Sequence, residues 1–184
     1  MKKIFVIALL AILAAPSVNA QKYFTRAGMI SFFSATKMEN ISAENNKVAA
    51  VMDASTGDIE FTVLIKSFMF EKALMQEHFN ENYMESDTYP KATFKGKIEN
   101  VAAIKFGTNG TQNVKVTGDL TMHGVTKKVT VDAVVTIKDG KVNATSKFAI
   151  NPKDYNIEIP SVVQENISEK IDISVSLNLE ELKK

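Results

Sequence analysis

The sequence contains no cysteine and no tryptophan, and it has only two histidines, His78 and His123. The absence of cysteine excludes disulfide bonds, thiol redox chemistry and thiolate metal sites. It also excludes a lipid anchor attached to a cysteine. Without Cys and Trp, the chain lacks the Cys…Trp…Cys core that immunoglobulin-like sandwiches favour. The stability of the fold must therefore come from its apolar core and its sheet.

The first twenty residues have the pattern of a targeting segment. Lys2 and Lys3 precede an apolar run, Ile4–Ala15, which is too short to cross a membrane as a helix. Pro16 ends this run, and Val18-Asn19-Ala20 fits a cleavage site before Gln21. We expect residues 1–20 to be a cleaved signal peptide and residues 21–184 to be one periplasmic or secreted domain. An N-terminal membrane anchor is the alternative.

The chain also lacks an excess of charge of either sign. Removal of Lys2 and Lys3 with the signal peptide leaves 20 basic residues against 21 acidic ones. A nucleic-acid-binding protein needs a basic stripe or patch, so we expect no nucleic-acid partner. The remaining chain is long enough to bury one sizeable core.

Strict alternation of apolar and polar residues is strongest between Val114 and Ile150. Such a period of two places alternate side chains on opposite faces of a strand. Asp139-Gly140 separates two alternating runs, which is a strong signal for a hairpin turn. The stretch therefore predicts an antiparallel meander with one apolar face. The inward-facing residues of its three runs are expected to be Val114, Val116, Leu120, Met122, Val129, Val131, Ala133, Val135, Ile137, Val142, Ala144, Phe148 and Ile150.

Weaker alternation predicts further strands over residues 23–36, 47–54, 58–66, 91–100 and 168–182, with a turn at Asn45-Asn46. The period changes after Ser67, where an apolar stripe predicts a helix of about three turns over 69–79, capped by Ser67. A long loop, 80–90, then precedes the next strand. About eight strands and one short helix favour an all-β fold, a closed antiparallel eight-stranded β-barrel, over a two-sheet sandwich.

Three segments of the chain carry recognisable motifs: HFNENYMESDTYPKATFKG (78–96), TGDLTMHGVTKKV (117–129) and FAINPKDYNIEIP (148–160). Together they resemble the signature segments of the YceI-like family, whose members are periplasmic or secreted, lipocalin-like proteins that bind polyisoprenoid lipids. Family members usually begin with an Asp-x-x-His-Ser pattern. Here the corresponding region reads YFTRAGMISFFSAT and has no histidine, so any role of those histidines is absent from this chain.

The resemblance implies a barrel whose apolar interior holds an isoprenoid lipid, with a quinone-type or polyprenyl chain as the candidate ligand and no other cofactor required. The implied partners are this lipid and, transiently, a membrane from which it is exchanged; the protein itself would be a monomer or a homodimer. We expect the ligand to touch Phe32, Phe61, Val63, Phe94, Leu120, Met122, Val131, Val135, Phe148, Ile150, Ile173 and Val175. Candidate lid or mouth residues are Phe70, Leu74, Phe79, Tyr83, Met84 and Tyr89.

Two other functions remain open at this stage. The barrel could be filled by its own side chains, as in a stress-response or structural periplasmic protein without a ligand. A hydrolase would use His78 or His123. However, neither histidine belongs to an HExxH motif, and the chain has no Gly-x-Ser-x-Gly nucleophile motif. We therefore expect no catalytic residues, no metal site and no enzymatic activity.

Overall fold

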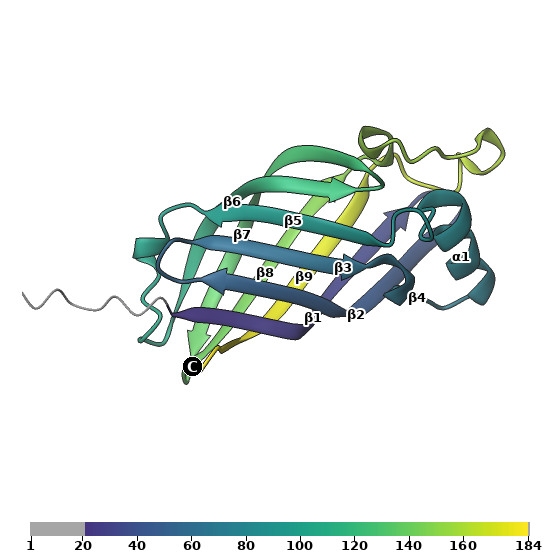
Figure 1. The fold of residues 1–184 in the computed structure, drawn as a ribbon. Helices are drawn as coiled ribbons and strands as arrows, with labels where there is room; N and C mark the ends of the chain where they lie inside the picture. The colour runs from purple at the N-terminus through teal and green to yellow at the C-terminus, as the bar shows by residue number, and fades with distance from the viewer. Residues whose placement is uncertain (1–20, 184) are drawn as a thin grey trace, which may run out of the picture.

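Eight antiparallel strands close into a barrel in the computed structural model, which describes residues 21–183 (Figure 1). The expected signal peptide, residues 1–20, lies outside the described residues. The strands of the ring are β1 (Lys22–Ala35), β2 (Asn40–Asp53), β3 (Asp58–Leu64), β5 (Lys91–Ile98), β6 (Gly110–Met122), β7 (Val125–Lys138), β8 (Lys141–Ile150) and β9 (Ile171–Glu181). Pairing of β1 with both β2 and β9 closes the ring, which confirms the predicted barrel.

Two tight turns fix the register of the meander β6–β7–β8. The first, His123-Gly124, lies between the paired residues Met122 and Val125, and its φ angles are 50° and 73°. The second, Asp139-Gly140, has φ angles of 51° and 76°. Turns with two positive φ angles match the right-handed twist of the strands that they join. The hairpin predicted at Asp139-Gly140 is confirmed.

The inner and outer faces of the meander are those that the alternation predicts. Val135, Ile137 and Val142 belong to the buried core. On the outer face, the ammonium group of Lys115 lies 2.8 Å from a carboxylate oxygen of Asp132 on the neighbouring strand. Apolar side chains therefore point into the barrel and charged ones into solvent.

The predicted turn at Asn45-Asn46 is wrong, because β2 continues through these residues. The buried side chain of Asn45 donates a hydrogen bond to the carbonyl of Leu64 (2.9 Å) and accepts one from the amide of Lys47 (2.9 Å). The register between β1 and β2 shifts at this point, as in a β-bulge. The asparagine pair thus bends a long strand instead of ending it.

The predicted helix over 69–79 is shorter and begins later than expected. Helix α1 spans Ala73–His78 and has no side-chain cap, and a π-helical turn, Phe79–Tyr83, extends it into the expected loop. The first residues of the apolar stripe instead form a two-residue strand, β4 (Met69–Phe70), which pairs with β2 outside the ring. Pairing of Met69 and Phe70 with β2 outweighs the weak helical propensity of this segment.

The connecting segments differ between the two ends of the barrel. At one end, which we call the mouth, lie α1, the β1–β2 turn and the long connection between β8 and β9 (right side of Figure 1). That connection contains two 3₁₀ turns, Pro152–Tyr155 and Ser161–Val163. The opposite end carries a 3₁₀ turn, Val101–Ala103, and the Asp139-Gly140 hairpin. Among residues 21–183, no helix is long and apolar enough to cross a membrane.

Candidate functional site

An apolar cavity of about 370 Å³ runs inside the barrel. All eight strands of the ring contribute to its wall, from Ile98 and Val142 near the far end to Glu39 and Asn166 at the mouth. Small-molecule sites in proteins typically have volumes of about 300–1,000 Å³, and an apolar cavity of about 150 Å³ already binds benzene. The barrel is therefore hollow, and its cavity is large enough for part of an extended apolar molecule.

Every interior residue selected from the sequence lies on the wall of this cavity. The twelve are Phe32, Phe61, Val63, Phe94, Leu120, Met122, Val131, Val135, Phe148, Ile150, Ile173 and Val175. They come from β1, β3, β5, β6, β7, β8 and β9 and therefore surround the barrel axis. Alternation located those on the other strands, because each lies on the apolar face of its strand, whereas the run that carries Phe32 is apolar on both faces.

The six candidate lid residues divide into two groups. Phe70, Phe79, Tyr83 and Met84 line the cavity, whereas Leu74 and Tyr89 do not. Leu74 is 61% exposed, because the short helix that begins at Ala73 places it on the outer face. The ring of Tyr89 packs on His123 instead, with centroids 4.6 Å apart.

Four phenylalanine rings attach the segment 68–79, which carries several of the candidate lid residues, to the barrel. Phe79 packs on Phe32 (5.5 Å between centroids), on Phe68 (5.4 Å) and on Phe70 (5.1 Å). Phe32 belongs to β1, and the other three belong to the segment 68–79, so the cluster joins that segment to the wall. Sequence reasoning missed Phe68. Its signal was the i, i+2 spacing with Phe70, which is typical of a strand.

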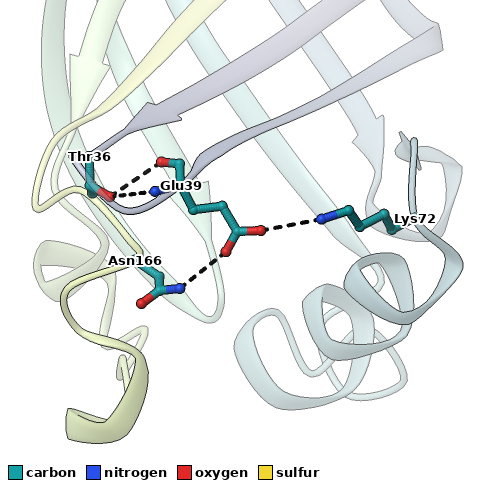
Figure 2. Close-up of polar contacts among 4 residues, drawn as sticks. All are labelled: Thr36, Glu39, Lys72 and Asn166. Atoms are coloured by element: carbon teal, nitrogen blue, oxygen red, sulfur yellow. Dashed lines mark hydrogen bonds and ion pairs between the residues drawn. The ribbon is translucent and has the colours of Figure 1, made fainter.

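The cavity wall becomes polar at the mouth, where Glu39, His78 and Asn166 contribute to it. Figure 2 shows the Glu39 carboxylate between the connection that carries Asn166 and the start of α1. The side-chain amide of Asn166 donates to one carboxylate oxygen (3.2 Å), and the ammonium group of Lys72 lies 3.5 Å from the other. No local pattern predicts this contact, because Glu39 and Asn166 lie on loops 127 residues apart.

The three motif segments meet around His123. Its Nδ1 atom donates to the carbonyl of Tyr155 (3.1 Å), since a carbonyl can only accept, and its Nε2 atom lies 3.5 Å from a carboxylate oxygen of Glu85. Tyr89, from the same segment as Glu85, covers the ring. The side chain of His123 is only 8% exposed, and it is not part of the cavity wall. Its contacts are those of a residue that joins the segments at the mouth.

The titratable groups near the cavity are few. Burial raises the pKa of Tyr83, whose side chain lines the mouth, and that of Tyr155 beneath His123. Within the part of the chain that the structure describes, no three His, Cys, Asp or Glu side chains lie close enough together to hold a metal ion. The arrangement is that of an apolar binding cavity with a polar rim.

The sequence of the chain matches the model of the YceI-like domain over residues 19–179. Among curated proteins, none matches it. Its fold is also found in solved structures of low sequence identity, which support the fold alone.

The first of these structures is a polyisoprenoid-binding domain from Saccharophagus degradans, described as implicated in plant cell wall breakdown. It is 16% identical, with a TM-score of 0.78, and the match covers 89% of this chain and 99% of that one. BcnA from Burkholderia cenocepacia is 19% identical, with a TM-score of 0.68 and coverages of 83% and 95%. A YceI protein from Campylobacter jejuni is also 19% identical, with a TM-score of 0.56 and coverages of 100% and 94%.

Proposed function

This chain belongs to the YceI-like family, and on that premise we propose that it binds an isoprenoid lipid, with the tail inside the barrel and the head at the mouth. The observation that carries the proposal is the hollow cavity, whose wall is predominantly apolar and which has the charged and amide side chains of Glu39 and Asn166, together with His78, at its mouth. The Saccharophagus degradans domain, which has the same fold, is described as polyisoprenoid-binding. A quinone-type or polyprenyl lipid has this combination of an apolar chain and one polar end.

Burial of the tail supplies the binding energy. Removing apolar surface from water contributes about 25 cal/mol per Å², or about 0.8 kcal/mol per buried CH₂ group. Part of this gain offsets the freedom that the ligand loses on binding. Several isoprene units therefore suffice for stable binding without a dense set of polar contacts, in agreement with the apolar wall.

We assign the protein a binding role and not an enzymatic one. His123, the better candidate for catalysis, is held by Tyr155 and Tyr89 and does not reach the cavity wall. His78 lies at the mouth, on the exposed end of α1. The position of His123, away from the cavity wall, does not suit general acid–base chemistry on a molecule bound along the barrel axis.

We further propose that residues 1–20 direct export to the periplasm or the exterior, and that the mouth touches a membrane transiently during lipid exchange. Met38, Met69, Leu74 and Val162 are exposed apolar residues on the segments around the mouth. Insertion of these side chains among lipid head groups would bring the cavity entrance to the source of its ligand.

Extraction of lipids from the purified protein, followed by mass spectrometry, tests the proposal. We expect a co-purifying isoprenoid, and we expect added isoprenoid to raise the melting temperature, because a ligand that binds only the folded state stabilises it. Val131→Phe should narrow the cavity and reduce this rise. Val134→Phe, on the outer face of the same strand, is the control. An empty protein whose melting temperature no isoprenoid changes would contradict the proposal.

A further inference from the structure

We propose that Glu39 makes the cavity selective for isoprenoids with an uncharged head, such as a free alcohol, and excludes those with an anionic phosphate head. This inference rests on the proposed function, because it concerns the head of the lipid whose tail the barrel holds. It goes beyond that function by naming the residue that distinguishes two classes of ligand with the same tail.

The position of Glu39 is fixed by the turn between β1 and β2. The Thr36 hydroxyl accepts hydrogen bonds from the amides of Met38 and Glu39, both at 3.1 Å. It also donates to the carbonyl of Glu39 at 3.3 Å (Figure 2). The backbone amide of Thr36 donates to the same carbonyl at 3.0 Å. These bonds hold the backbone at the base of the side chain, so the carboxylate is presented at the mouth in a defined position.

The carboxylate is part of the cavity wall and is largely shielded from solvent. Only 28% of the Glu39 side chain is exposed, and its neighbours on the wall include Ile41 and Ile167. A head group that enters beside these residues gives up much of its hydration. Interactions between charges strengthen where water is excluded, so a second negative charge is strongly disfavoured here. An uncharged hydroxyl can instead donate a hydrogen bond to the carboxylate.

Lys72 does not turn this position into an anion site. Its side chain is 65% exposed and, unlike Glu39, is not part of the cavity wall. The ammonium group lies 3.5 Å from a carboxylate oxygen of Glu39, and the lysine end of this ion pair is exposed to solvent. Exposure of the lysine weakens its interaction with Glu39 compared with a fully buried pair. A head group coming from the cavity therefore meets the carboxylate before it meets the cation.

The charges of the surrounding segments act in the same direction. The segments 36–40, 65–90 and 151–170, which form the mouth, carry ten acidic residues and five lysines. Excess charge of one sign around a cleft produces a potential that raises or lowers the local concentration of charged ligands. The mouth thus disfavours anions during entry, and Glu39 disfavours them again at the position of the head.

Binding of two lipids with identical tails tests the inference: geranylgeraniol and geranylgeranyl monophosphate. We expect the wild-type protein to bind the phosphate at least tenfold more weakly than the alcohol in low-salt buffer. Glu39→Gln keeps the size of the side chain and removes the charge, and should reduce this difference to less than threefold. Lys72→Gln should enlarge it, because it removes the cation that is paired with Glu39. Glu71→Gln removes an exposed charge at the mouth outside the cavity wall; as the matched control it should reduce the difference far less than Glu39→Gln, because its charge acts only through the long-range potential.

The outcomes separate this inference from the proposed function. If wild type binds both lipids equally, or if Glu39→Gln, folded as shown by circular dichroism, keeps the full difference, the selectivity is overturned while lipid binding stands. If wild type binds neither lipid, the proposed function fails and the inference fails with it. If Glu39→Gln does not fold, an unchanged difference in Lys72→Gln is sufficient to overturn the role of this carboxylate.

Discussion

Gly96 and Gly118 lie directly opposite each other on β5 and β6, and a Cβ atom on Gly118 would be 2.4 Å from the Cα atom of Gly96. The ring of Phe94 occupies the space above both residues, because a Cβ atom on either would lie within 2.7 Å of its Cζ atom. The two glycines therefore let an aromatic ring lie flat against the wall of the cavity. A glycine in mid-strand often marks such a close approach.

Gly118→Ala should destabilise the protein by about 2–4 kcal/mol, because overpacking of this kind usually costs about 1–3 kcal/mol and here the clash is with backbone. The free energy of unfolding in urea measures this change. Gly110→Ala, at the open end of the same strand, has nothing within 4 Å of the added Cβ and should change stability by less than about 0.5 kcal/mol. If the two variants had the same free energy of unfolding, β5 and β6 would be able to move apart around Gly118 without loss of stability, which would contradict the prediction.

Phe79→Ala should loosen the lid segment, since Phe79 contacts Phe32, Phe68 and Phe70. We expect a moderate loss of stability, about 1–3 kcal/mol for a half-buried ring, and release of a bound isoprenoid that is about tenfold faster. Stopped-flow displacement of a fluorescent lipid measures the rate. Leu74→Ala, on the outer face of α1, should leave the rate unchanged. If both variants release the lipid at the wild-type rate, the segment does not act as a lid.

His123→Ala should lower stability by about 1–3 kcal/mol, because it leaves the buried carbonyl of Tyr155 without its donor and removes the packing surface of Tyr89. Lipid binding by the protein that remains folded should persist, since His123 is not part of the cavity wall. Thermal unfolding and a lipid-binding assay give the two readouts. His78→Ala, at an exposed position, is the control for stability. Loss of binding without loss of stability would instead indicate a direct role of His123 in the function.

The stability of the protein should fall as the solution becomes strongly alkaline. Burial raises the pKa of Tyr23, Tyr83 and Tyr155 above the ordinary value of 10.0. A group whose pKa is higher in the folded than in the unfolded state contributes stability that is complete below the unfolded pKa. That contribution is lost as the pH rises through the folded pKa. Urea unfolding between pH 9 and pH 11 should show the decline, and Tyr155→Phe should make it shallower. A pH-independent stability across this range would contradict the expectation.

The parts of the fold that were predictable are those governed by local rules. Alternation along Val129–Ile137 fixes which side chains face inward, and the positive φ angles favoured by Asp139-Gly140 set the register of the hairpin. The prediction of a turn at Asn45-Asn46 was wrong because a contact between residues distant in sequence decides the structure there. The bond from Asn45 to Leu64 satisfies a buried amide through a partner 19 residues away, and no local rule anticipates such a partner.

The same distinction applies to the candidate site. Its apolar wall follows from strand periodicity, so Leu120, Phe148 and Ile173 could be located in advance. The polar mouth could not, because Glu39 and Asn166 belong to loops without periodicity and meet only when the barrel closes. The prediction that Leu74 lines the mouth failed for a related reason. The residue at which a short helix begins depends on the contacts of the residues before it, and here Phe70 pairs with a residue of β2.

The pairing of β1 with β9, which closes the barrel, affects how the chain folds. β1 pairs with β9, so Ile30 near the start of the described chain meets Val175 near its end. Contacts at such separation in sequence are slow to form, because a long loop must be closed before they contribute. Until β9 has added to β1, the ring is an open sheet with two unpaired edges and an uncovered apolar face. A protein truncated before Ile171 should therefore aggregate instead of forming a smaller barrel, since unpaired edges invite association with other chains.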